Sequence, residues 1–140
     1  GIAGNYSEGW TGFSGRDSID LTIRLARPAD LAQVSVGFCH SAADWVLQPD
    51  SAEVQWSRNG IRYSPWQPLG IVRPIADPQR ESRHITLRRS YAPRASLFHR
   101  AEARRARYVR IRIHCRPRLP EWHVAAGEPA WLMIDEINVK

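Results

Sequence analysis

The sequence predicts an all-β protein built as an antiparallel β-sandwich. Apolar and polar residues alternate along several short runs, as they do in strands that bury one face. Ten prolines and nine glycines separate these runs at short intervals, and such spacing favours a sandwich over alternating helices and strands. The length of 140 residues fits one domain with a core of its own.

Alternation is clear in the first half of the chain. Apolar residues at every second position from 19 to 25 predict a half-buried strand, which a turn at Pro28-Ala29-Asp30 is expected to end. Two further strands are expected where the apolar positions are Val34, Val36 and Phe38, then Ala52, Val54 and Trp56. Asn59-Gly60 follows and predicts a tight hairpin-type turn, because both residues tolerate a positive φ angle.

Strands are also expected in the second half. Ile85 and Leu87 mark a short one. Residues 95–105 contain good helix formers but are interpreted as a basic loop. The clearest strand runs over 108–115, with Val109, Ile111 and Ile113 on one face and arginine or histidine on the other. The last strand is expected at 131–139.

Charge and hydropathy limit the partners. The net charge is +6, and Lys140 is the one lysine among 20 basic residues. The arginines are scattered, and no nucleic-acid motif is present, so we expect no nucleic-acid partner. No apolar run reaches the length of a membrane span. The chain opens abruptly at Gly1-Ile2-Ala3-Gly4, which suggests a piece excised from a longer protein.

Two cysteines, Cys39 and Cys115, are too few for a disulfide framework or a four-cysteine zinc site. Cys115 continues the inward series of its strand, whereas Cys39 is out of phase with its neighbours. One bridge between them is possible in principle. Two reduced and largely buried thiols are the simpler expectation.

The sequence contains no recognisable catalytic motif. No glycine-rich phosphate loop follows a strand, no serine lies in a nucleophile elbow, and the five histidines lack metal-ligand spacing. Asp135 and Glu136 are adjacent, and neighbours on a strand face opposite sides. They are therefore not expected to act as an acid–base pair across one bond, and we expect this domain not to be an enzyme.

Six tryptophans are many for this length. Trp56 is in phase with Val54 and is expected in the core, and Trp131 begins the last strand. The others lie among turn residues: Trp10, Trp45, Trp66 and Trp122. Such rings either plug the ends of the sandwich or present an aromatic face to a sugar, whose hydroxyls would bind nearby arginine, histidine and acidic side chains.

Glu136 is a candidate calcium ligand. Its side chain should point away from the inward-facing Ile137 and Val139, toward a loop where Asp17 offers a carboxylate and Gly12 and Gly15 offer carbonyls. Calcium prefers such oxygen ligands. The alternative is a surface glutamate paired with an arginine.

Five segments in one order carry a family resemblance: WTGFSGRDSIDLTIRL, VSVGF, DWVLQPDSAEVQWSRNG, ARYVRIRIH and PEWHVAAGEPAWLMIDEINV. From about Trp10 to Val139, the chain resembles the discoidin domain, also called the coagulation factor V/VIII type C domain. It is most similar to the version at the C-terminal end of bacterial β-N-acetylhexosaminidases of glycoside hydrolase family 20. Related modules form carbohydrate-binding family 32.

The resemblance implies a galactose-binding-domain-like jelly roll and a non-catalytic module of a larger glycoside hydrolase. Residues 1–140 would form one discoidin-like domain, an excised C-terminal module whose first strand is missing. The resemblance also implies a structural calcium, with Glu136 of the last strand among its ligands and Asp17 as a further candidate. The protein would be bacterial and secreted, periplasmic or at the cell surface.

In sugar-binding relatives the ligand lies on loops at one end of the sandwich. By position, the candidates here are Trp45, Trp122 and His123, with Arg118 and Glu121 as hydroxyl partners. The Trp122-His123 pair is equally well interpreted as a structural lock. We therefore expect a glycan-binding accessory module. The alternatives are a structural module that packs on the parent catalytic domain, and a module that binds an anionic surface through its arginines.

Overall fold

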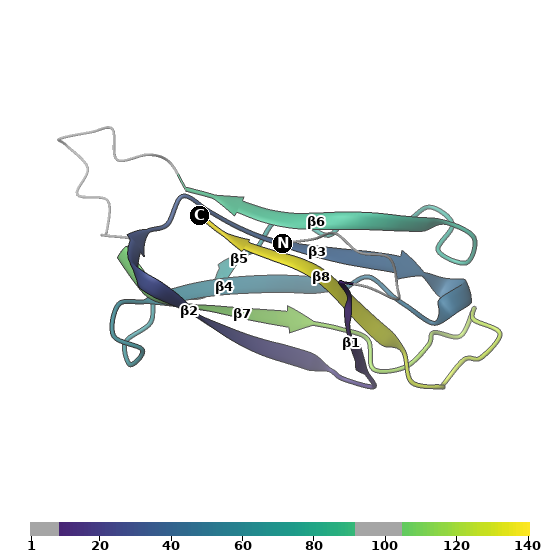
Figure 1. Ribbon diagram of the computed structural model, residues 1–140. Helices are drawn as coiled ribbons and strands as arrows, with labels where there is room; N and C mark the ends of the chain where they lie inside the picture. Colours follow the sequence, from purple (N-terminus) through teal and green to yellow (C-terminus); the bar gives the residue numbers. More distant parts are fainter. Residues whose placement is uncertain (1–8, 92–104) are drawn as a thin grey trace.

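The computed structural model describes residues 9–91 and 105–140. Within these ranges the chain forms eight strands and one short 3₁₀ turn, η1 (Figure 1). Their bounds are β1 (Thr11–Ser14), β2 (Ser18–Asp30), β3 (Gln33–Ser41), η1 (Ala42–Asp44), β4 (Ser51–Ser57), β5 (Gln67–Pro68), β6 (Ser82–Ser90), β7 (Arg105–His114) and β8 (Trp131–Val139). No helix in the described part of the chain is long and apolar enough to span a membrane.

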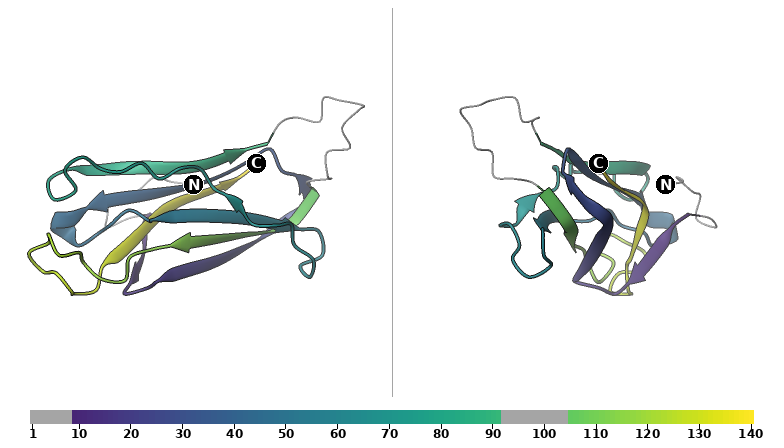
Figure 2. Two further views of the ribbon diagram at one scale, coloured as in Figure 1. Left: turned by 180° about the vertical axis from the view of Figure 1, so that it is seen from behind. Right: turned by 60° about the vertical axis from the view of Figure 1, so that its left-hand side comes forward.

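The strands form two antiparallel sheets that stack as layers (Figure 2). Sheet A has the order β1-β8-β3-β6, and sheet B has the order β2-β7-β4-β5. Most neighbours in space are distant in sequence, because the chain crosses repeatedly between the layers. The predicted fold class, an antiparallel β-sandwich of jelly-roll type, is confirmed.

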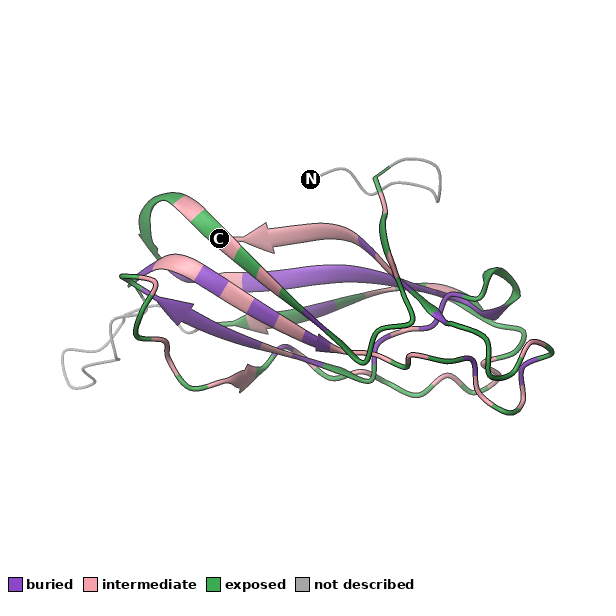
Figure 3. Ribbon diagram, turned by 90° about the horizontal axis from the view of Figure 1, so that it is seen from below, coloured by how far each residue is buried: buried purple, intermediate pink, exposed green. Residues whose placement is uncertain are grey.

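The core lies between the two sheets. Strands of sheet B alternate between buried and more exposed positions, as the sequence pattern predicts (Figure 3). Trp56 is buried in this core, also as predicted. The side chains with the least exposure include Val34, Val36, Phe38, Val54, Leu69, Val109, Ile111 and Ile113.

Several elements differ from the sequence-based expectation. The prediction of a turn at Pro28-Ala29-Asp30 is wrong, because β2 continues to Asp30 with a register shift between Arg24 and Ala29. β2 is an edge strand, where a proline without an N–H is tolerated. β6 is nine residues long rather than short. β7 begins at Arg105, and the rest of the loop expected at 95–105 lies outside the described residues.

The turn at Asn59-Gly60 is wider than a two-residue hairpin. Gly60 has a φ of 76°, as expected, but Asn59 does not have a positive φ. The Asn59 side-chain oxygen instead accepts the N–H groups of Ile61 and Arg62, both at 2.9 Å. An asparagine that caps its own turn in this way widens the loop.

Neither Cys39 nor Cys115 forms a disulfide bond, as expected. Cys39 is buried although it is out of phase with the inward residues, because the whole of β3 from Val34 to Ser41 is buried. Cys115 is half-buried and packs against the core.

The two adjacent carboxylates, Asp135 and Glu136, lie in a β-bulge of β8. Val36 pairs with Ile137 and Phe38 pairs with Ile134, so Asp135 and Glu136 together lie opposite Gly37. The simple alternation assumed for these two residues is therefore interrupted, and Ile134 and Ile137 both pack on the core three residues apart.

The Asp135 carboxylate fills the space above Gly37. A Cβ atom on Gly37 would lie 1.9 Å from Asp135 Oδ1. Asp135 Oδ2 lies 2.8 Å from His84 Nε2, and the Asp135 side chain is 1% exposed. Trp10 packs edge-on against His84, with 5.8 Å between ring centres. This carboxylate is thus enclosed by structural partners.

We predict that Gly37→Ala lowers the free energy of unfolding by about 2 kcal/mol or more, because the new methyl group displaces the Asp135 carboxylate from its pairing with His84. Chemical denaturation measures this loss. In an Asp135→Ala background the methyl group finds room, so the same Gly37→Ala change should cost much less. Equal penalties in the two backgrounds would contradict this account of the bulge.

Candidate functional site

One end of the sandwich collects three irregular segments: η1 with the residues after it, the segment between β5 and β6, and the loop 115–130 between β7 and β8. They lie together at the right-hand end of Figure 1. Backbone hydrogen bonds tie the residues after η1 to the start of β8, from Leu47 N to Trp131 O and from Trp131 N to Trp45 O, both at 2.9 Å. The Gln79 side chain, between β5 and β6, donates to Trp122 O of the loop at 3.2 Å. Segments far apart in sequence therefore meet on a rigid base.

The loop 115–130 has a small core of its own. Leu47, Leu119 and Ala130 are buried together, and Trp122 packs against them. Leu119 N donates to Glu128 O at 2.8 Å, and its carbonyl accepts Gly127 N at 3.0 Å. Gly127 has a φ of 88°, which a glycine adopts without strain. The loop thus holds Trp122 in one position although it contains no strand or helix.

His123 links this loop to η1. Its Nε2 atom donates to Ala42 O at 2.7 Å, and its Nδ1 atom accepts the N–H of Ala125 at 2.9 Å. The ring is buried and makes an edge-on contact with Trp45 and a tilted contact with Trp122, with 6.4 Å and 5.9 Å between ring centres. Both ring nitrogens are engaged within the protein, so His123 positions the two tryptophans and has no nitrogen free for a ligand.

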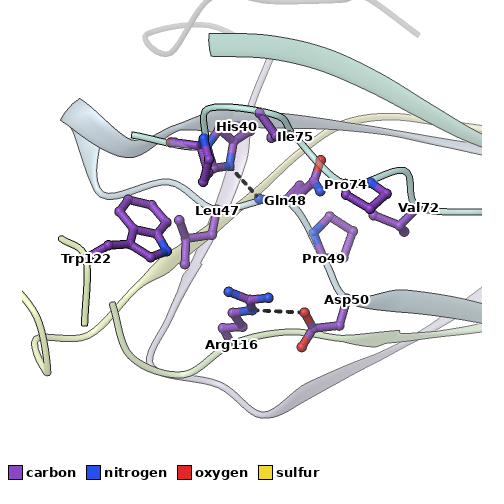
Figure 4. Close-up of a pocket in the computed structure, with 11 residues that line it drawn as sticks. His40, Leu47, Gln48, Pro49, Asp50, Val72, Pro74, Ile75, Arg116 and Trp122 are labelled. Atoms are coloured by element: carbon purple, nitrogen blue, oxygen red, sulfur yellow. Dashed lines mark hydrogen bonds and ion pairs between the residues drawn. The ribbon is translucent and has the colours of Figure 1, made fainter. Parts of the chain in front are cut away.

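Trp122 stands between two hollows. The first, which we call the Arg116 hollow, has a volume of about 340 Å³. Trp122 stands at one end of it beside Leu47, and Arg116 and Asp50 form another wall (Figure 4). Its lining residues are His40, Leu47, Gln48, Pro49, Asp50, Val72, Pro74, Ile75, Pro78, Arg116 and Trp122.

Arg116 and Asp50 are charged groups of this hollow with hydrogen-bonding capacity left. Arg116 Nε donates to Asp50 Oδ1 at 3.0 Å, which leaves the two terminal guanidinium nitrogens and Asp50 Oδ2. The side chains of His40 and Gln48 are engaged elsewhere. His40 Nε2 donates to Pro78 O and His40 Nδ1 accepts Gln48 N, while Gln48 binds Arg73 O and Arg83.

The second hollow, which we call the Trp45 hollow, has a volume of about 350 Å³. Its lining is mostly apolar, and Val124 is almost fully exposed there. The amide of Gln79 supplies a polar group, and its nitrogen donates to Trp122 O at 3.2 Å. The lining residues are Ala42, Ala43, Trp45, Gln79, Trp122, His123 and Val124.

The structure brings together three of the predicted site residues, Trp45, Trp122 and His123. The predicted partners Arg118 and Glu121 are exposed and line neither hollow. Arg118 instead donates to Gly127 O at 2.9 Å.

Sequence reasoning missed Asp50 and Arg116, which are 66 residues apart. Ser51 of β4 pairs with His114 of β7, so the residues just before Ser51 and just after His114 lie at the same end of these two strands. The available signal was a charged residue within two positions of an end of each of two strands, and only the pairing of these strands makes that signal meaningful.

Two other aromatic rings lie on sheet B, and an arginine covers each. The Arg112 guanidinium carbon is 4.6 Å from the centre of the Trp66 ring, and that of Arg110 is 4.1 Å from the centre of the Tyr63 ring. Arg112 also donates two hydrogen bonds to Asp20, which lower the pKa of that carboxyl. These rings are thus already stacked on cations and offer a sugar less surface than Trp122.

The two predicted calcium ligands do not come together. Ser14 pairs with Trp131 and Thr11 with Ile134, so Glu136 and Asp17 lie beyond opposite ends of the β1–β8 pair. A hydrogen bond to Asn138 lowers the pKa of Glu136. No group of three His, Cys, Asp or Glu residues that could hold a metal occurs within 9–91 and 105–140. A site shared by Asp17 and Glu136 does not fit this geometry, and calcium binding by Glu136 with other ligands stays a prediction.

Comparison with known proteins gives a distant likeness in fold. No family model and no curated protein matches the chain, whereas five chains among solved structures match it. One similar solved structure is of carbohydrate-binding modules from the β-sandwich superfamily, with 8% identity and a TM-score of 0.31. The match covers 94% of this chain and 57% of that one, so this chain spans less than two thirds of its length. A likeness this distant carries no argument about function.

We predict that His123→Ala lowers the free energy of unfolding by about 3 kcal/mol, because it leaves Ala42 O and Ala125 N without their partner and opens a cavity. Chemical denaturation tests this. The half-exposed His114 side chain has a 3.5 Å contact with Glu53, so His114→Ala should change stability by less than about 0.5 kcal/mol. Similar losses in the two variants would refute the locking role of His123.

We also predict a loss of stability at high pH through Cys115. Burial raises the pKa of its thiol from 9.0 to about 11, and Asp50 and Asp17 add to the shift. The folded protein therefore holds this proton more tightly than the unfolded chain, and stability falls as the pH rises from about 9 to about 11. Denaturation midpoints measured across that range should fall less in Cys115→Ala. Parallel pH profiles for the two proteins would rule the effect out.

Proposed function

We propose that this domain is a non-catalytic carbohydrate-binding module and that the Arg116 hollow is its binding site. The observation that supports this most is the position of the Trp122 ring in the same hollow as the hydrogen-bonded Arg116–Asp50 pair. A volume of about 340 Å³ lies at the lower end of the range for small-molecule sites and suits a small ligand such as one sugar ring.

The chemistry of the hollow matches the two sides of a sugar. The apolar C–H face of the sugar can pack on Trp122 and on aliphatic neighbours such as Leu47 and Ile75. A hydroxyl group both donates and accepts a hydrogen bond. The free guanidinium N–H groups of Arg116 and Asp50 Oδ2 supply one donor set and one acceptor at a fixed spacing, which suits two neighbouring hydroxyls. Arg116 and Asp50 thus take the place of Arg118 and Glu121 in the proposed site.

The proposed site binds weakly when it acts alone. We expect a dissociation constant of about 0.1–1 mM, because little area is buried and the desolvation of hydroxyls offsets much of the gain. Attachment to an enzyme makes such affinity useful by raising the local concentration of substrate. In line with the family resemblance, we propose a parent glycoside hydrolase of the β-N-acetylhexosaminidase type, acting outside the bacterial cytoplasm.

A second candidate function is a structural module that packs on its parent catalytic domain. The exposed apolar side chains of the Trp45 hollow favour this candidate, since Val124 is 99% exposed and Trp45 is 38% exposed. An apolar patch of this kind is typical of a contact between domains. The anionic-surface alternative is less favoured, because Arg110 and Arg112 on sheet B are already stacked and hydrogen-bonded.

A glycan array, followed by calorimetric titration with hits such as N-acetylglucosamine or galactose, tests the proposal. We predict that Trp122→Ala and Arg116→Ala each weaken binding about tenfold or more, because one removes the stacking surface and the other removes charged hydrogen bonds. Both variants should keep the native circular dichroism spectrum.

Arg118→Ala is a matched control for Arg116→Ala. Arg118 is exposed on the same loop but lines neither hollow, so its removal should change affinity less than about twofold. The site assignment fails if both arginine variants weaken binding equally. If no glycan on the array binds and the domain associates tightly with the parent catalytic domain, the structural alternative replaces the proposal.

A further inference from the structure

We propose that the Trp45 hollow is a second subsite, which takes the neighbouring sugar of the same chain. The module would then recognise an oligosaccharide rather than a single sugar unit. This inference rests on the function proposed above, because Trp122 lines both hollows and so makes them neighbours. The two hollows are also of similar volume, about 340 and about 350 Å³.

The backbone conformation of Trp45 supports this second subsite. Trp45 has a φ of 63°, and among the described residues it is the one residue other than glycine with a positive φ. A bulky residue in this region is strained. Hydrogen bonds hold it there, from Trp45 N to Ala42 O at 3.0 Å and from Trp131 N to Trp45 O at 2.9 Å.

Core packing does not account for this strain. A glycine would make the same turn without it, and the Trp45 side chain lies at the surface, 38% exposed. The Trp45 residue therefore stays partly exposed at a conformational cost, as expected of a ring that forms part of a binding surface.

The contacts that hold the Trp45 and Trp122 rings also support a second subsite. His123 is buried between η1 and the loop 115–130 by its two hydrogen bonds, and it contacts both Trp45 and Trp122. The aromatic walls are thus held in place before any ligand arrives, which lowers the entropic cost of binding. The remaining lining is apolar, apart from Gln79, whose side-chain oxygen is an acceptor suited to a sugar hydroxyl.

The test compares monosaccharides with their linear trisaccharides by calorimetric titration. The probes are N-acetylglucosamine, galactose, glucose, mannose and xylose, each with its β-linked trisaccharide. We expect the wild-type protein to bind one trisaccharide about tenfold more tightly than its monosaccharide. Trp45→Gly should remove most of this preference and leave the monosaccharide affinity within about twofold, because glycine keeps the backbone turn without strain.

Trp131→Ala is the matched control. Trp131 is 39% exposed, close to the 38% of Trp45, and it lines neither hollow. Its removal should leave the trisaccharide preference unchanged. Loss of the preference in Trp131→Ala as well as in Trp45→Gly would overturn the assignment, and so would a preference that survives Trp45→Gly. A trisaccharide preference that survives Trp45→Gly is the result expected if another protein covers this hollow.

The two proposals fail in different ways. If Trp122→Ala and Arg116→Ala weaken monosaccharide binding but Trp45→Gly leaves the preference intact, the second subsite is wrong and the first stands. If Trp122→Ala and Arg116→Ala leave monosaccharide binding unchanged, the proposed function is wrong. Absence of binding to every probe overturns both.

Discussion

Strands β4 and β7 lie side by side with Ser51 opposite His114, and both the core and the candidate site depend on this register. On the inner face it aligns Val54 with Ile111, two of the least exposed residues in the sandwich. A slip of one residue would turn every one of these side chains to the outer face. Just past the ends of the same pair, it brings Asp50 and Arg116 within 3.0 Å. The burial of apolar area therefore stabilises the geometry of a polar pair that contributes little to stability itself.

The end of the sandwich keeps its shape without regular secondary structure, and three devices achieve this. The small core around Leu119 anchors the loop 115–130. The ring of His123 satisfies backbone groups on two segments. Backbone hydrogen bonds tie the residues after η1 to the start of β8. Because buried polar groups are costly when left unpaired, these bonds make one loop conformation much more favourable than its alternatives. Trp45 remains in a strained conformation within this framework.

Several charged residues elsewhere in the fold make contacts within the protein, which leaves them less available to a ligand. Asp135 occupies the bulge opposite Gly37 and is shielded from solvent by His84. On sheet B, Arg110 and Arg112 stack on Tyr63 and Trp66. In both places the functional groups of a charged or aromatic side chain are already engaged by other parts of the protein. The two hollows beside Trp122 differ, because their walls combine aromatic surface with hydrogen-bonding groups that have capacity left.

The sequence alone predicted the sandwich class, the residues of most core strands, the burial of Trp56 and the bounds of β8, because alternation with a period of two depends on local geometry. It also singled out Trp45, Trp122 and His123. It misjudged the chain at Pro28-Ala29-Asp30, where tolerance of a proline depends on β2 being an edge strand. The contact of Asp50 with Arg116, and the absence of Arg118 and Glu121 from the lining of both hollows, followed from the three-dimensional fold. The contact between Asp50 and Arg116 depends on which strands pair and in which register. These long-range contacts leave no periodic signal in either strand taken alone.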